Sequence, residues 1–168
     1  MDKEDLYKQL DKVDDWINNA DTKLGVVLAF IGVFSGFIIS NDRLNRNVGN
    51  LLDSGTKVEQ FVVILLIYLT SISLLLSIFM CIRGLMAKTN NSKKTLLFWG
   101  HVKEFKDYET FKRFKEQQSE EELKSDLYNQ IHTNSVIVYN KFYRFRWSVI
   151  FTLISLSAYI SIYFFSIL

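Results

Sequence analysis

Residues 61–82 read FVVILLIYLTSISLLLSIFMCI, 22 consecutive positions without a charged side chain. An α-helix of this length is about 33 Å long, which matches a bilayer hydrocarbon core of about 30 Å. Residues 147–168 form a second charge-free run of 22 positions, and residues 24–40 form a third of 17. All 20 basic and 18 acidic residues lie outside these runs. The sequence therefore predicts an all-α membrane protein whose three transmembrane helices are these three runs.

Lysine and arginine are unequally distributed between the segments that flank the runs. Residues 1–23 contain four, residues 41–60 contain three and residues 83–146 contain thirteen. An excess of Lys and Arg is typical of the cytoplasmic side of a membrane. We therefore expect residues 1–23 and 83–146 to be cytoplasmic and residues 41–60 to be an external loop. The N-terminus is then cytoplasmic and the C-terminus external.

Both predicted cytoplasmic segments have helical periodicity. Apolar side chains recur at steps of four and three before the first span and again before the third, which predicts two amphipathic helices that continue into the membrane. Ser119 and Glu122 predict a capping box at the start of the second helix. Residues 88–94, KTNNSKK, are predicted to be a loop. We expect the two helices to pair in a small helical cytoplasmic bundle. The first seam is Leu6, Leu10, Val13, Ile17, Ala20 and Leu24, and the second is Tyr128, Ile131, Ser135, Val138, Phe142 and Phe145.

Small residues share one face of the first span. Gly25, Ala29, Gly32, Gly36 and Ser40 follow one another at steps of four or three, and Gly32 and Gly36 form a GxxxG pair. Such a stripe lets another helix approach closely within lipid. It is predicted either to pack against another span of the same chain or to join copies of the chain in a homo-oligomer.

Motifs for catalysis or metal binding are absent from the sequence. His101 and His132 occur without an HExxH pattern, and Cys81 is the one cysteine, which excludes an internal disulfide and a four-cysteine zinc site. No Gly-rich phosphate loop or nucleophile elbow occurs. We expect the chain not to be an enzyme and to have no metal site, no cofactor and no nucleic-acid partner.

Two groups of residues near the spans are candidates for ligand binding. Asp21 and Lys23 lie where the chain enters the first span; they fit either an interfacial belt or a charged binding site. Phe98 and Trp99 follow the predicted loop; they fit either core packing or an aromatic platform on which a flat base stacks.

A third group lies on the helix that precedes the third span. Gln130, Asn134 and Lys141 are spaced at i, i+4 and i+11, so they share one face, which is either a solvated edge or the lining of a pocket. Residues 83–146 carry a net charge of +5. That charge suits an anionic ligand or the anionic surface of a lipid membrane.

The arrangement of several short motifs resembles the PycTM family, the transmembrane effectors of bacterial Pycsar anti-phage systems. The motifs occur in the expected order over nearly the whole chain. They are Trp16-Ile17, Ala20-Asp21-Thr22-Lys23, Phe98-Trp99-Gly100, Asp126-Leu127, Gln130-Ile131, Ser135 and Lys141-Phe142.

The resemblance implies a function in the bacterial cell inner membrane. A partner pyrimidine cyclase makes cyclic CMP or cyclic UMP on infection, and the effector responds by impairing the membrane, which causes abortive infection. In this hypothesis Lys23 or Lys141 binds the phosphate of the nucleotide, and Phe98 or Trp99 stacks on its base. The alternative is a constitutive membrane scaffold or accessory subunit whose cytoplasmic helices bind a protein partner.

Overall fold

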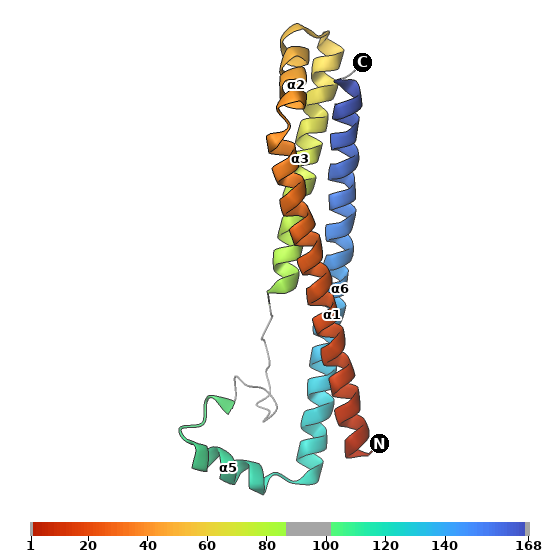
Figure 1. The fold of residues 1–168 in the computed structure, drawn as a ribbon. Helices are drawn as coiled ribbons and strands as arrows, with labels where there is room; N and C mark the ends of the chain where they lie inside the picture. Colours follow the sequence, from red (N-terminus) through yellow and green to blue (C-terminus); the bar gives the residue numbers. More distant parts are fainter. Residues whose placement is uncertain (1, 87–101, 167–168) are drawn as a thin grey trace. The chain divides into compact units, whose positions relative to one another are not determined.

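The computed structural model of the chain describes residues 2–86 and 102–166. These residues form helices and contain no strand, and the order of the helices is visible in Figure 1. Three of the helices, α1, α3 and α6, are long and apolar enough to cross a membrane. The all-α class and the three membrane-capable helices predicted from the sequence are thus confirmed. The helices are α1 (Lys3–Ser40), α2 (Asp42–Ser54), α3 (Lys57–Leu85), α5 (Tyr108–Gln117) and α6 (Glu120–Phe165).

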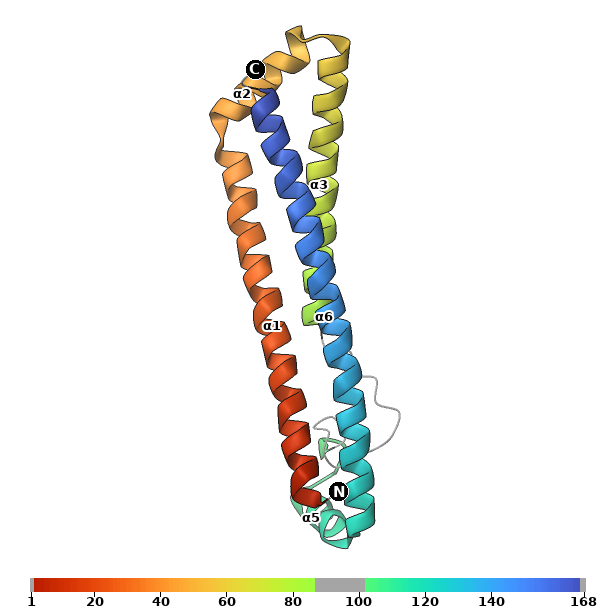
Figure 2. The ribbon, with the colours of Figure 1, turned by 90° about the vertical axis from the view of Figure 1, so that its right-hand side faces the viewer.

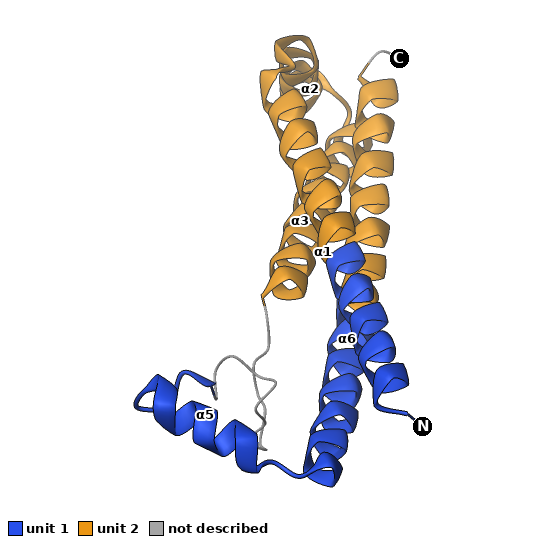
Figure 3. Cartoon of the chain, turned by 60° about the horizontal axis from the view of Figure 1, so that its bottom comes forward, with its two compact units in different colours: residues 1–20, 87–141 blue, residues 21–86, 142–168 orange. Residues whose placement is uncertain are grey.

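The chain divides into two compact units, which are coloured separately in Figure 3. Unit 1 consists of Met1–Ala20 and Ala87–Lys141, and unit 2 consists of Asp21–Met86 and Phe142–Leu168. Helices α1 and α6 each contribute residues to both units without a break in the helix. Helix α5 belongs to unit 1 alone, and α2 and α3 belong to unit 2 alone.

Unit 2 is held together by two apolar clusters and by a row of hydroxyl groups. One cluster contains Leu24, Ile31 and Cys81, so it joins α1 to α3. The other contains Phe34, Leu44, Tyr159 and Ile162, from α1, α2 and α6. The ring of Phe34 contacts that of Tyr159 edge to face, with 5.5 Å between centroids.

Hydroxyl groups lie along the contact between α3 and α6, and we call this row the hydroxyl ladder. The hydroxyl of Ser77 donates to the carbonyl oxygen of Ser148 at 2.8 Å and lies 2.8 Å from the hydroxyl of Thr152. The hydroxyl of Ser155 donates to the carbonyl oxygen of Thr70 at 3.0 Å. All five residues are buried. Because a lipid environment offers no water, these bonds fix the register of α3 against α6.

Residues 41–60, predicted to be an external loop, contain helix α2. Asn41 caps the helix by accepting from the backbone N–H of Leu44 at 3.2 Å, and its amide donates to the hydroxyl of Tyr159 at 3.2 Å. The side chain of Asn47 donates to the carbonyl oxygen of Ser166. Helix α2 therefore lies beside the C-terminal end of α6, as Figure 2 shows.

Helix α3 begins at a capping box. The backbone N–H of Thr56 donates to the carboxylate of Glu59 at 2.8 Å, and the N–H of Glu59 donates to the hydroxyl of Thr56 at 3.4 Å. The hydrogen bond from the backbone N–H of Thr56 to the carboxylate, and then that from its side chain, lower the pKa of Glu59. Two unpaired N–H groups of the first turn are thereby satisfied, which defines where the helix starts.

The predicted start of α6 and the predicted seam of α1 are confirmed. The N–H of Ser119 donates to the carboxylate of Glu122 at 2.9 Å, and the N–H of Glu122 donates to the hydroxyl of Ser119 at 3.2 Å. On α1, Leu6, Val13 and Ala20 are buried within unit 1. The regular spacing of these apolar residues was therefore sufficient to identify the packed face of α1.

The seam predicted for α6 is wrong at two of its positions. Tyr128 and Ser135 are exposed. The buried residues of α6 in unit 1 follow a neighbouring line that includes polar side chains: Leu127, Ile131, Asn134, Val138 and Lys141. A search for apolar periodicity alone skips the two polar members, Asn134 and Lys141, and so shifts the seam to the adjacent face.

Helix α5 has no buried residue. Its N-cap is Asp107, whose carboxylate accepts from the backbone N–H of Thr110 at 2.8 Å, and this bond lowers the pKa of Asp107. The ring of Phe105 contacts those of Phe111 and Phe114, each at 5.5 Å between centroids. These three phenylalanines therefore pack against one another.

Candidate functional site

Three polar side chains form a connected group in unit 1, which we call the amide relay. Asn134 on α6 donates from its Nδ2 to Oδ1 of Asp14 on α1 at 2.7 Å. Gln130, one turn before Asn134, donates from its Nε2 to Oδ1 of Asn134 at 3.0 Å. Asn134 is only 9% exposed. Asn134 therefore lies within the helix pair, whereas Gln130 is partly exposed and Asp14 is exposed.

The hydrogen-bonding capacity of this region is not fully used. Oε1 of Gln130 and Nδ2 of Asn129 are buried, and neither has a hydrogen-bond partner in the described part of the chain. A buried polar atom without a partner costs roughly 1–3 kcal/mol. Such atoms are uncommon in folded proteins, and a bound ligand is one way to satisfy them.

Lys141 lies on the same face of α6 as Asn134, seven residues further along. Its side chain is 5% exposed, although it carries an ammonium group. Burial of a lysine is uncommon because the charge loses its hydration. Lys141 is therefore a buried cation of unit 1. Its contact with a phosphate group stays a prediction.

Asp21 and Lys23, the other charged candidates, belong to unit 2. The ammonium of the exposed Lys23 lies over the rings of Phe142 and Phe145, 5.2 and 5.9 Å from their centroids. Asp21 is half-buried. A cation over aromatic faces fits the interfacial interpretation of Lys23, because the rings stabilise its charge where the helix meets the membrane.

The remaining predicted aromatic pair, Phe98 and Trp99, lies outside the described residues. The same is true of the predicted loop at residues 88–94 and of His101. Their predicted roles stay predictions.

The small-residue stripe of α1 faces away from the other described helices. A Cβ atom added at Gly25, Gly32 or Gly36 would meet no other part of the described chain within 4 Å, and Ala29 is exposed. Helix α1 contacts its neighbours through Leu24, Ile31 and Phe34 instead. The stripe is therefore open among the described residues, and its role in helix packing or in a homo-oligomer stays a prediction.

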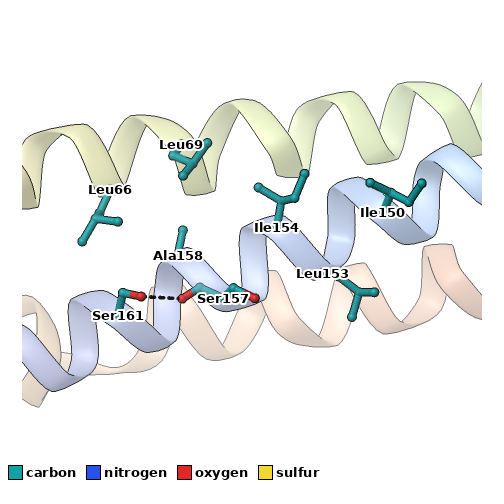
Figure 4. A pocket seen from close by; sticks show the side chains of 8 residues that line it. All are labelled: Leu66, Leu69, Ile150, Leu153, Ile154, Ser157, Ala158 and Ser161. Atoms are coloured by element: carbon teal, nitrogen blue, oxygen red, sulfur yellow. Dashed lines mark hydrogen bonds between the residues drawn. The ribbon is translucent and has the colours of Figure 1, made fainter.

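Unit 2 also contains an open groove of about 440 Å³ between α3 and α6 (Figure 4). Its walls carry no charged side chain, and the hydroxyl of Ser161 donates to the carbonyl oxygen of Ser157 within the same helix. A groove of this kind suits acyl chains better than a charged nucleotide. The lining residues are Leu66, Leu69, Ile150, Leu153, Ile154, Ser157, Ala158 and Ser161.

Asp14 and Asn129 were missed in the sequence. Asp14 directly follows the seam residue Val13, and its partner Asn134 lies 120 residues further along the chain. No local motif joins two residues so far apart. A usable signal is the occurrence of a polar residue beside, or within, each of the two seams, because paired helices often place such residues opposite one another.

Comparison with known proteins relates both units to a single family. A family model described as the Pycsar effector protein domain, PycTM, matches residues 5–168. The Pycsar effector protein GmPycTM of Gulbenkiania mobilis is 25% identical to the chain over 158 residues, which are 83% of this chain and 80% of the relative. No solved structure matches the chain.

Proposed function

Because the chain belongs to the PycTM family of Pycsar effector proteins, we propose that it senses a cyclic pyrimidine nucleotide and then impairs the bacterial inner membrane. The family expected from the sequence motifs is confirmed, and it makes the chain an anti-phage defence effector. In this proposal a partner pyrimidine cyclase supplies cyclic CMP or cyclic UMP. The effector performs no catalysis and needs no cofactor, and the loss of membrane integrity causes abortive infection.

The amide relay supports a sensing role for unit 1. It contains two of the residues predicted to bind ligand, Gln130 and Asn134, and the unpaired acceptor of Gln130. Lys141 adds a buried cation to the same face of α6. A cyclic nucleotide has a base that needs hydrogen-bonding groups and a phosphate that needs a cation, and both kinds of group occur in this unit.

Helices α1 and α6 supply a route from sensing to the membrane. Each continues without a break from the seams of unit 1 into a membrane-capable segment of unit 2. A ligand that binds more tightly to one pairing of the two seams than to another would change the packing of both helices together. Moving such an equilibrium from 1:99 to 99:1 requires a difference in binding free energy of roughly 5.5 kcal/mol between the two states.

The proposed function is tested by measuring membrane integrity in bacteria that express the chain. Propidium iodide uptake is compared with an active pyrimidine cyclase, with a catalytically inactive cyclase and with no cyclase. Uptake with the active cyclase alone is expected. Absence of uptake in all three, with the chain present in the membrane fraction, would contradict the proposal and favour the scaffold alternative.

We predict that the N-terminus is cytoplasmic and the C-terminus external, because thirteen lysines and arginines lie in residues 83–146 and three in residues 41–60. Alkaline phosphatase, which is active only outside the cytoplasm, is fused after residue 168 or placed before residue 1. Activity is expected from the C-terminal fusion alone. Activity from the N-terminal fusion would reverse the assignment.

We predict that Gly32→Leu reduces association between copies of the chain without unfolding it. The stripe of α1 is open in the single chain, and a leucine there would keep a second backbone from approaching closely. Chemical crosslinking in membranes measures the fraction of dimers and larger species. Val33→Leu, on an exposed neighbouring position, is the matched control. Equal crosslinking of both variants and the unmodified chain would show that copies do not meet through this stripe.

A further inference from the structure

The groove of unit 2 and the small-residue stripe of α1 repeat the same spacing of residues. Four residues that α6 contributes to the groove follow one another at steps of four, three and four, and the glycines and alanine of the stripe do the same. Each set covers three turns of helix, about 16 Å along the axis. The groove set is Ile150, Ile154, Ser157 and Ser161, and the stripe set is Gly25, Ala29, Gly32 and Gly36.

The two sets also lie at about the same level of unit 2. Each residue of the groove set stands 125 positions after its counterpart in the stripe, and Tyr159 stands 125 positions after Phe34. The rings of Phe34 and Tyr159 are in contact, with 5.5 Å between centroids. Helices α1 and α6 run in the same direction in unit 2, as Figure 2 shows. Both sets are therefore at about the same depth in any bilayer that the unit spans.

Neither surface is covered by the described part of the chain. The glycines of the stripe face open space, and the groove is open between α3 and α6 (Figure 4). Leu69 and Leu153 project from the groove and are 41% and 55% exposed. The stripe cannot fill the groove of its own chain, because α1 is packed against α3 and α6 through Leu24, Ile31 and Phe34, on another of its faces.

We propose that the α1 stripe of one copy docks into the groove between α3 and α6 of a second copy. The small side chains of Ser157, Ala158 and Ser161 let a helix lie deep in the groove, and the glycines of the stripe leave room for Leu69 and Leu153. Steps of four and three on both helices are the spacing of helices that pack side by side. Such close packing is the main source of helix association in lipid.

The membrane itself aligns the two surfaces. Copies of one chain insert in one orientation, and their charge-free runs place them at one depth. The stripe of one copy therefore meets the groove of the next without a shift along the helix. An acyl chain is the competing occupant of the groove, but an acyl chain requires no particular spacing and leaves the match with the stripe without a role.

The contact joins two different surfaces, so it can repeat. Each copy in a pair still has one free stripe or one free groove, and further copies can add until a ring closes or a row of copies extends. A contact of one stripe with another stripe would instead stop at two copies. This inference goes beyond the proposed function and does not depend on nucleotide sensing.

The test is disulfide crosslinking in native membranes between two differently tagged copies of the full chain. One copy carries Gly32→Cys and the other Ser157→Cys, which are level with each other and exposed. A disulfide requires two Cα atoms within about 7 Å. Gly36→Cys with Ser161→Cys is a second pair, one turn further along. Membranes are taken from cells with and without an active pyrimidine cyclase, and crosslinking in either state counts as docking.

Two controls define the background of this experiment. Val33→Cys, one position from Gly32 and 74% exposed, replaces Gly32→Cys in a matched pair on a neighbouring face of α1. The unmodified chain contains only Cys81, which is fully buried. Neither control is expected to crosslink.

The expected result is a disulfide-linked dimer that carries both tags, formed by the mixed pairs and by neither variant alone. One chain with both Gly32→Cys and Ser157→Cys is expected to form a ladder of species larger than a dimer. Crosslinking of Gly32→Cys to itself without a mixed dimer, or a ladder that stops at the dimer, would overturn the inference in favour of a stripe-to-stripe contact. Absence of a mixed dimer from both pairs, at normal amounts in the membrane, would also overturn it and leave the groove to acyl chains.

Discussion

Gly84→Leu is expected to keep the chain from accumulating in the membrane. A Cβ atom at Gly84 would lie 2.7 Å from Cδ1 and 3.1 Å from Cδ2 of Leu24. Leu24 is itself fully buried, so its side chain has little room to move away. Leucine adds three further carbon atoms to that first clash, and overpacking of this kind costs about 3 kcal/mol. Immunoblots of the membrane fraction measure the loss.

Two further variants separate overpacking from a general effect of substitution. Gly84→Ala adds the Cβ atom alone. We expect it to lower the free energy of unfolding by only about 1 kcal/mol and to reduce accumulation less than Gly84→Leu does. Gly25→Leu makes the same change on α1 where no other part of the described chain lies within 4 Å, and normal accumulation is expected. If Gly84→Leu accumulated as well as Gly25→Leu, the close packing of α1 against α3 would be wrong.

Lys141→Ala is expected to reduce killing by an active cyclase by at least about a hundredfold. We attribute to Lys141 the binding of the phosphate, and a charge-assisted bond to a buried group contributes about 3 kcal/mol or more. Colony counts with and without induction of the cyclase measure the response. Immunoblots of the membrane fraction, made in parallel, distinguish loss of response from loss of the protein.

The control variants for Lys141 separate its charge from its packing. Lys141→Met retains an unbranched side chain of similar length without the charge, and it is expected to be as unresponsive as Lys141→Ala. Lys112→Ala removes an exposed lysine of the same unit and is expected to respond normally. Full killing in Lys141→Met would remove the charge of Lys141 from the proposed mechanism.

Features encoded by neighbouring residues could be predicted from the sequence. The charge-free runs identify the three membrane-capable helices because each run is long enough by itself to cross the hydrocarbon core. Ser119 and Glu122 identify the start of α6 because a capping box involves only four consecutive residues. The seam of α1 follows from one regular pattern of apolar residues.

Features that depend on distant contacts could not be predicted. The hydroxyl ladder is invisible to hydropathy because the packed faces of α3 and α6 carry Ser and Thr within otherwise apolar runs. The packed face of α6 in unit 1 includes Asn134 and Lys141, and apolar periodicity does not count either of them. The amide relay requires the pairing of Asp14 with Asn134, which only the folded helices establish.

The hydroxyl ladder also determines when unit 2 can be completed during synthesis. The partners of Ser77 follow it by 71 and 75 residues, and at about 5–20 residues per second the ribosome needs roughly 4–15 seconds to make them. During that interval α3 is already long enough to insert, and its serine hydroxyls can bond only to carbonyl groups of their own helix. A chain broken off before residue 148 never gains these partners. The pairing of α3 with α6 is therefore completed only after residues 148–155 have been made, and until then the same hydroxyls are satisfied within α3.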